Sequence, residues 1–151
     1  VFVDFAHTDD ALEKMLWSVR GLLPEGGKLH IVFGCGGDRD RSKRPRMGCV
    51  ASTVGDIAYA TSDNPRSEDP EHILDEVLIG VPVDRRSLVH RIVDRKSAIQ
   101  AAIAAAAECD VVVIAGKGHE KNQILFDRVI PFDDVQVARE AIRHRKMSEE
   151  T

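Results

Sequence analysis

An acid, an amide and a guanidinium group fall together in Asp63-Asn64-Pro65-Arg66, directly after an apolar run at residues 57–60 that predicts a buried strand. Pro65 disfavours the helical region for the residue before it, so we expect an extended backbone at Asn64. The planar fork of donors on Arg66 suits a carboxylate group. These residue types therefore predict a loop that recognises a small polar ligand. On their own they also fit an ordinary turn with a solvated arginine.

Two glycine-containing loops follow two other apolar runs, and they read Gly34-Cys35-Gly36-Gly37-Asp38-Arg39-Asp40 and Gly116-Lys117-Gly118-His119-Glu120. Neither has the glycine spacing of a P-loop or a dinucleotide-binding loop. In a parallel α/β sheet, the loops at the carboxyl ends of neighbouring strands meet in one crevice. That crevice is expected to carry Arg39 and Arg66 as anion binders with Arg44 as a further candidate, Asn64 as an amide, and Asp63 and Glu120 as ammonium partners. Both signs of charge at separate points suit a zwitterionic small molecule.

Three basic side chains in these loops and near the start each have two interpretations. Lys117 either contacts a phosphate or is solvated, and we favour the solvated side chain. His119 is either a general base or a structural residue in a glycine turn, and we favour the structural role. His7 is either a nucleotide contact or part of a helix start, with neither favoured. We therefore assign no catalytic residue.

The apolar spacing alternates between the strand and helix patterns along the chain. This alternation predicts a doubly wound, Rossmann-like α/β domain with a mostly parallel sheet of about six strands and helices on both faces. We expect strands at residues 1–5, 28–35, 56–61, 88–93 and 111–115, a hairpin or edge strand at 123–132, and helices at 11–23, 46–54, 71–79, up to 108 and up to 146. The expected helix starts are marked by Thr8, by Pro70, by Asp94 or Ser97, and by Asp133 or Asp134.

The composition, with 43% apolar and 30% charged residues, is typical of one globular domain over residues 1–151. The net charge of −4 gives no indication of a nucleic-acid partner. No apolar run reaches the ~20 residues that cross a bilayer, so we expect no membrane contact and a cytoplasmic protein.

The spacing of Cys35, Cys49 and Cys109 fits no zinc motif, so we expect buried thiols and no metal site. Because Val1 is not an initiator Met, we expect a piece of a longer protein.

Five motifs, in this order, resemble the C-terminal domain of Mur ligases: Asp4-Phe5-Ala6-His7-Thr8, Gly34-Cys35-Gly36-Gly37-Asp38-Arg39-Asp40, Lys43-Arg44-Pro45, Thr61-Ser62-Asp63-Asn64-Pro65-Arg66 and Gly116-Lys117-Gly118-His119-Glu120. They cover nearly the whole chain. Within the family they are most similar to the ligases that add meso-diaminopimelate to UDP-N-acetylmuramoyl-L-alanyl-D-glutamate, the UDP-MurNAc dipeptide, in peptidoglycan synthesis. Two positions near the start depart from the family, with Phe5 where Tyr is usual and Asp9 where Pro is usual.

The resemblance implies a domain that brings the incoming amino acid to an ATP-dependent ligase and closes on ATP. The UDP-sugar domain and the central ATPase domain, which binds most of the ATP and Mg²⁺, then lie outside this chain. In the full enzyme, ATP phosphorylates the D-glutamate γ-carboxylate and the amine of meso-diaminopimelate attacks the acyl phosphate. The family's amino-acid contacts fall on Arg39, Asp63, Asn64, Pro65, Arg66, Gly116 and Glu120, and the residues facing ATP on Asp4, His7 and Asp38.

Arg66 is expected to set a preference for diaminopimelate over lysine, because the two differ by one carboxylate on the far carbon. Lysine leaves the guanidinium unpaired, which costs roughly 3–5 kcal/mol for a buried pair. Two alternatives stay open at this point: a related amide ligase domain specific for lysine or glutamate, and a small-molecule-binding domain with no chemistry of its own. In each case we expect the isolated chain to be inactive as a ligase.

Overall fold

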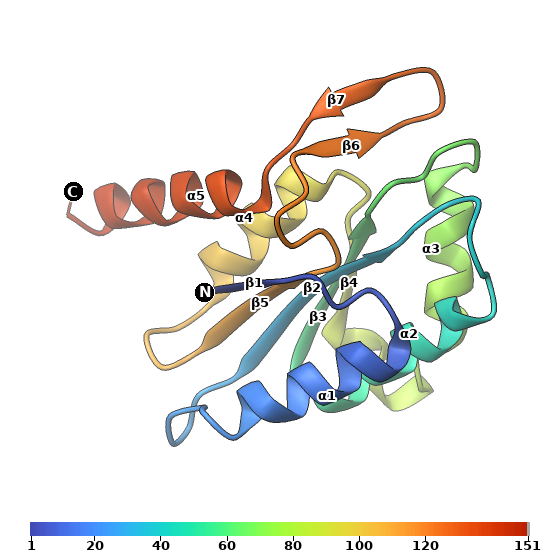
Figure 1. Cartoon of the computed structure of the whole chain (residues 1–151). Coiled ribbons are helices and arrows are strands. Elements are labelled where there is room, and N and C mark those ends of the chain that lie inside the picture. The colour runs from blue at the N-terminus through green and yellow to red at the C-terminus, as the bar shows by residue number, and fades with distance from the viewer. Residues whose placement is uncertain (151) are drawn as a thin grey trace.

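The computed structural model describes residues 1–150, which form a central sheet of five parallel strands. Their order across the sheet is β1-β5-β2-β3-β4 (Figure 1). The strands are β1 (Phe2–Asp4), β2 (Leu29–Cys35), β3 (Ile57–Ser62), β4 (Val89–Arg91) and β5 (Val111–Ala115). Every residue of β2 is buried, as a parallel sheet covered on both faces requires. The predicted parallel α/β fold is therefore confirmed.

A separate antiparallel hairpin consists of β6 (Asn122–Ile124) and β7 (Val129–Pro131). It projects beyond the main sheet in Figure 1. The sequence left a hairpin and an edge strand open here, and the hairpin is correct. The main sheet consequently has five strands instead of the expected six or so, because the backbone of β6 pairs with β7 and with the loop after β3 instead of with a sheet edge. The contact with that loop is a hydrogen bond of 3.1 Å from the Arg66 N–H to the Ile124 carbonyl oxygen.

Five α-helices and one 3₁₀ helix connect these strands: α1 (Asp9–Arg20), α2 (Lys43–Val54), α3 (Pro70–Ile79), η1 (Val83–Leu88), α4 (Arg95–Ala105) and α5 (Asp134–Glu149). Side chains cap the starts of four helices: Asp69 caps α3, where the sequence indicated only Pro70, and the other three caps are those that the sequence predicts. Thr8 accepts from the N–H of Ala11, Asp94 caps α4 and Asp133 caps α5. The 3₁₀ helix η1 was not predicted, because its six residues carry no helical apolar spacing.

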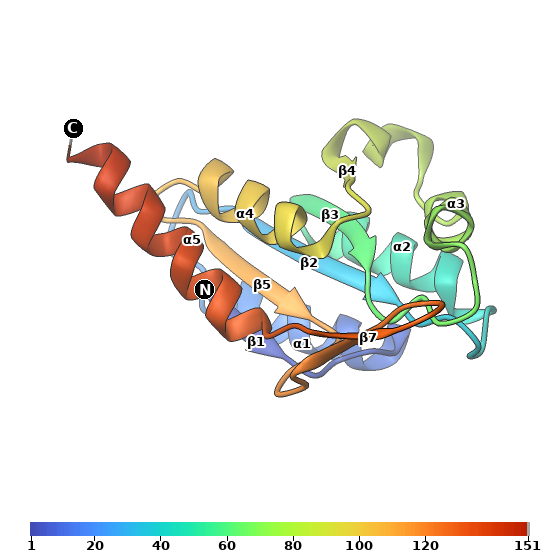
Figure 2. The same ribbon diagram turned by 90° about the horizontal axis from the view of Figure 1, so that it is seen from above.

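Helices cover both faces of the sheet. Leu16 of α1, Met47 of α2 and Leu74 of α3 are buried against one face. Ile99 of α4 and Val137 of α5 are buried against the other. Figure 2 shows α1 and α4 on opposite sides of the strands. The doubly wound arrangement expected from the sequence is thus present.

The carboxyl ends of the strands lie along one edge, since all five strands are parallel. The neighbouring strands β2 and β5 lead to opposite faces: α2 follows β2 onto one face, and α5 follows β5, after the hairpin, onto the other. Such a reversal opens a crevice where ligands bind in folds of this class. The loops after β2, β3 and β5 lie at this carboxyl edge.

Among residues 1–150 no helix is both long enough and apolar enough to cross a membrane. The three cysteines are free thiols, and only Cys35 is buried. The expectation of three buried thiols is wrong for Cys49 and Cys109, which lie on the outer sides of α2 and of the turn before β5.

Candidate functional site

The loop after β3 is tightly held and presents Arg66 in an unusual backbone conformation. Arg66 has φ +52°, which side chains rarely adopt. Its guanidinium Nη1 donates to the carbonyl oxygen of Gly37 at 2.9 Å, and its side chain is half-buried. The backbone conformation thus fixes the direction in which the Arg66 side chain leaves the loop. The guanidinium donors that Gly37 does not use are available to a ligand.

The loop after β2 packs directly on the loop after β3. The Gly37 N–H donates to the Asn64 carbonyl oxygen at 2.8 Å, and a Cβ at Gly37 would lie 1.8 Å from the Pro65 oxygen. A Cβ at Gly36 would lie 2.9 Å from Arg66 Nη1 and 3.7 Å from Arg39 Cγ. The two arginine side chains therefore lie on the same side of the molecule, next to Gly36. Only glycine at position 37 allows the two loop backbones to approach this closely.

Lys117, in the loop after β5, is completely buried. Its Nζ donates to Asn64 Oδ1 at 2.8 Å and lies 3.4 Å from Asp63 Oδ1 and 3.3 Å from Glu120 Oε2. The prediction of a solvated Lys117 is therefore wrong. Three oxygen acceptors from two loops replace its water shell, which is how a buried ammonium group is tolerated.

The two expected ammonium partners, Asp63 and Glu120, thus already share one internal cation. They retain capacity for another, because a carboxylate offers about four acceptor positions. The Glu120 side chain is 38% exposed and that of Asp63 is 11% exposed. A Cβ at Gly116 would lie 2.9 Å from Asp63 Oδ2, so the carboxylate of Asp63 lies directly against the second glycine loop.

Arg44 lies beneath these loops and was misassigned from the sequence. It is 1% exposed, and it binds Glu68 through both terminal nitrogens, at 3.0 and 2.6 Å, and Glu76 at 2.8 Å. The idea that Arg44 binds a ligand anion is therefore wrong, since protein carboxylates already occupy it. Its hydrogen bonds lower the pKa of Glu68 to about 2. Arg44 also donates to the Gly36 oxygen at 3.1 Å and so supports the loop that carries Arg39.

A buried ion pair that the sequence did not reveal joins α4 and α5 under the site. Arg95 and Asp134 are both fully buried and form two parallel hydrogen bonds, of 2.8 and 2.7 Å. Arg95 also donates to the carbonyl oxygens of Ser62 and Ala115, the last residues of β3 and β5. No local sequence pattern indicates that these two residues are partners. The one local sign is that Asp133 caps α5, which leaves Asp134 without a capping role.

The residues expected to face ATP lie at two places, Asp4 and His7 at and just after the end of β1 and Asp38 in the loop after β2, and their polar groups have protein partners. Asp4 Oδ1 accepts from the Ala6 N–H at 2.8 Å, and His7 Nδ1 lies 2.9 Å from the Phe5 oxygen. Asp38 accepts from both the hydroxyl and the N–H of Ser67, and these hydrogen bonds lower its pKa. Within residues 1–150 no three His, Cys, Asp or Glu side chains gather as metal ligands.

The remaining candidates for chemistry have surroundings that favour structural roles. The His119 ring stacks on Phe5 with 5.8 Å between ring centroids. Burial raises the pKa of Cys35 to about 12, so its thiol stays protonated at neutral pH.

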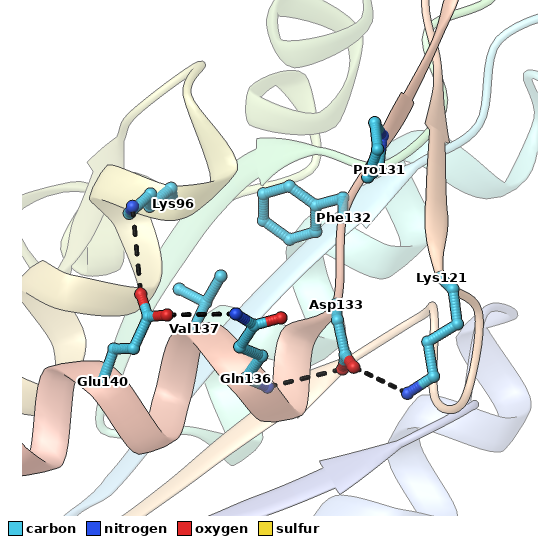
Figure 3. Close-up of a pocket in the computed structure, with 8 residues that line it drawn as sticks. All are labelled: Lys96, Lys121, Pro131, Phe132, Asp133, Gln136, Val137 and Glu140. Atoms are coloured by element: carbon cyan, nitrogen blue, oxygen red, sulfur yellow. Dashed lines mark hydrogen bonds and ion pairs between the residues drawn. The ribbon is translucent and has the colours of Figure 1, made fainter.

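A separate cleft of about 490 Å³ lies between α4, the start of α5 and β7 (Figure 3). Of its lining residues only Lys121, the last residue of the loop after β5, comes from the three loops described above, and none is an expected ligand contact. Figure 3 shows Lys96 turned toward Glu140 and Lys121 toward Asp133, so the charges of this cleft compensate one another. The carboxyl edge of the sheet, with charges of both signs from three loops, is the stronger candidate for a ligand site.

Comparison with known proteins shows the family to which the chain belongs. The family described as Mur ligase, glutamate ligase domain, matches residues 1–118. The UDP-N-acetylmuramoyl-L-alanyl-D-glutamate–2,6-diaminopimelate ligase of Thermosynechococcus vestitus is 52% identical over 145 residues, which cover 96% of this chain and 28% of the relative. The ligase of the same name from Syntrophomonas wolfei is 52% identical over 143 residues, or 95% of this chain and 29% of the relative.

A solved structure of a ligase with that name superposes with a TM-score of 0.88 at 43% identity, covering 95% of this chain and 29% of the other. The chain thus spans under a third of the length of the relatives that it matches. With a family match over 118 residues and such similar relatives, the chain belongs to the Mur ligase family and corresponds to its glutamate ligase domain.

Proposed function

We propose that this chain is the part of a peptidoglycan-synthesis ligase that binds meso-diaminopimelate and presents it to UDP-N-acetylmuramoyl-L-alanyl-D-glutamate. The observation that carries the proposal is the layout of charge at the carboxyl edge. Arg39 and Arg66 lie beside Gly36, and the carboxylates of Asp63 and Glu120 both contact the ammonium group of Lys117. One end of diaminopimelate carries a carboxylate and an ammonium group, and it matches this pair of charges.

The side chains would hold the outer end of the amino acid. Arg66 and Arg39 donate to its carboxylate, and Asp63 and Glu120 accept from its ammonium group. Holding that end leaves the second amine free to attack the activated D-glutamate carboxyl group. Orientation of this kind can supply much of the rate of an amide-forming step.

ATP and Mg²⁺ are the expected nucleotide substrate and metal cofactor of the whole ligase, and within residues 1–150 no three His, Cys, Asp or Glu side chains gather as ligands for the metal. Asp38 accepts hydrogen bonds from Ser67, and Asp4 Oδ1 accepts one from a backbone N–H, so contacts within the chain already engage both carboxylates in part. We therefore propose that the longer protein holds them mainly outside this chain, so that residues 1–151 alone have no ligase activity. Asp4, His7 and Asp38 then at most border the nucleotide.

A lysine-adding relative is the main alternative, and the charge of the site disfavours it. Arg39, Arg66 and Lys117 carry three positive charges against the two of Asp63 and Glu120. The surplus positive charge favours a ligand whose outer end carries a carboxylate, which lysine lacks. Glutamate lacks the outer ammonium group that Asp63 and Glu120 would bind.

The test is the ratio of kcat/KM for meso-diaminopimelate to that for lysine in the full-length ligase, with and without Arg66→Ala. Because Arg66 is half-buried, we expect its removal to reduce the preference by roughly a hundredfold, the lower end of the range for a buried pair.

Arg86→Ala, an exposed arginine on η1, is the matched control and should leave the ratio unchanged. A wild-type enzyme that prefers lysine, or an Arg66→Ala enzyme with an unaltered preference, would contradict the proposed function.

A further inference from the structure

Lys117 joins two of the three loops through one atom. Its Nζ lies within 3.4 Å of oxygens on Asp63 and Asn64 from the loop after β3 and of Glu120 from its own loop. All three acceptors are residues expected to contact the amino acid. Any fully buried ammonium group needs acceptors, and here every acceptor belongs to the expected site. A change at Lys117 would therefore reach that site directly.

The backbone around Lys117 directs its side chain inward. Gly116 has φ +114° and Gly118 has φ +54°, so the chain reverses on both sides of the lysine. A Cβ at Gly118 would also lie 2.9 Å from Phe5 Cβ. Two left-handed glycines therefore place the ammonium group under the crevice, at a backbone geometry that other residues rarely adopt.

Lys117 and the Ile124 N–H together determine which way the Asn64 amide faces. Asn64 Oδ1 accepts both from Lys117 Nζ at 2.8 Å and from the Ile124 N–H at 2.9 Å. Two donors at this atom require it to be the oxygen, and the amide NH₂ must then point away from both. The NH₂ group is thereby offered as a donor, which suits a ligand carboxylate.

The same ammonium group controls the balance of charge. Asp63 and Glu120 approach one nitrogen, at 3.4 and 3.3 Å, and without it they would repel each other. With it, their second oxygens can receive a ligand ammonium while the set of Arg39, Arg66, Lys117, Asp63 and Glu120 keeps a net positive charge. Loss of Lys117 would leave a more acidic site that tolerates lysine better.

We infer that Lys117 is a positioning and specificity-determining residue for the incoming amino acid, acting through Asp63, Asn64 and Glu120. This inference rests on the proposed function of the site. Lys117 itself stays in place beneath the ligand, since three acceptors and two glycines hold it.

The experiment compares steady-state kinetics of the full-length ligase with and without Lys117→Met. We expect the KM for meso-diaminopimelate to rise about 10- to 100-fold, as for other misplaced binding groups, with the KM for ATP and the KM for the UDP-MurNAc dipeptide unchanged. The preference for diaminopimelate over lysine should fall as well. Lys121→Met removes a lysine four residues further on, exposed and paired with Asp133, and should change none of these values.

A purely structural role would alter all three KM values or only kcat, and that result, or unchanged kinetics, would overturn the inference. If Lys117→Met does not fold, Lys117→Arg serves as the test variant. It keeps the positive charge, but its planar guanidinium cannot place one nitrogen among three acceptors. It should show the same selective rise in KM. The wild-type enzyme separates the two proposals: if it does not use diaminopimelate, the proposed function fails, whereas an insensitive Lys117 variant in an enzyme that does use it refutes only this inference.

Discussion

The basic side chains at the carboxyl edge lie at different depths, and depth separates those that can bind from those that support. Arg39 is exposed and Arg66 half-buried, so both can reach a ligand. Arg44 and Lys117 are buried and already paired with protein carboxylates. A buried cation with satisfied partners is costly to detach from them, so these two residues are expected to hold the loops in place.

Glu68 gives this support a pH dependence. Its pKa is about 2, chiefly because Arg44 donates hydrogen bonds to it, and an unfolded glutamate titrates near 4.5. The folded pKa is the lower one, so the pair stabilises the fold above the unfolded pKa and this contribution disappears as the pH falls toward 2. We expect a loss of roughly 1–3 kcal/mol in unfolding free energy across this window, allowing for solvent screening of a partly exposed group.

Urea unfolding at several pH values measures this loss. In the Glu68→Gln variant, the unfolding free energy should fall less steeply as the pH falls from 4.5 toward 2. Glu13→Gln, on the exposed side of α1, is the control and should leave the slope unaltered. An equal slope in Glu68→Gln and the wild type would contradict the assignment.

Gly116 combines backbone strain with a close contact, and the two can be separated. Gly116→Ala places a methyl group at φ +114° and against Asp63 Oδ2, whereas Gly26→Ala at φ +77° meets nothing within 4 Å. We expect roughly 1–2 kcal/mol for the strain alone in Gly26→Ala. Gly116→Ala should cost roughly 1–3 kcal/mol more, because the carboxylate must also move. Thermal unfolding of both variants measures the difference in unfolding free energy. Equal losses in the two variants would mean that Asp63 is not in close contact with Gly116.

At the scale of elements, the Arg95 and Asp134 pair fixes the helices under the site. Asp134→Ala leaves a fully buried guanidinium without its partner, which should cost roughly 3–5 kcal/mol of unfolding free energy. Replacing both residues, Arg95→Met with Asp134→Leu, should recover much of that loss.

Glu140→Ala breaks the neighbouring exposed pair with Lys96, 4.0 Å apart, and should cost no more than about 1 kcal/mol. Chemical denaturation measures the unfolding free energy of Asp134→Ala, of the double variant and of Glu140→Ala. A cost for Asp134→Ala as small as that for Glu140→Ala would show that the buried pair does not hold the helices together.

The elements themselves were largely predictable, and their long-range contacts were not. Helical spacing in residues 71–79 and the continuous apolar run of β5 are local signals, and so are the caps Thr8 and Asp133. The pairing of the three loops followed from the rule that carboxyl ends of parallel strands share an edge. By contrast, Lys117, Arg44 and Arg95 find partners 24 to 54 residues away. No local pattern distinguishes a lysine that finds three buried acceptors from one that stays in water.

At the scale of the whole molecule, the site is an open edge. Arg39, at the outer side of the crevice, and Glu120 remain partly or fully exposed, and the relatives extend over more than three times the length of this chain. We propose that other parts of the longer protein cover this edge when the amino acid is bound. Exclusion of water there would strengthen every charged contact described above.

We propose that three strand-end loops hold the outer end of meso-diaminopimelate. A crystal structure of the full-length ligase grown with that amino acid would show where it binds. We predict a ligand carboxylate within hydrogen-bonding distance of the Arg39 and Arg66 guanidinium groups, and a ligand ammonium beside Asp63 and Glu120. An amino acid bound instead in the cleft between α4 and α5, with those four side chains untouched, would contradict it.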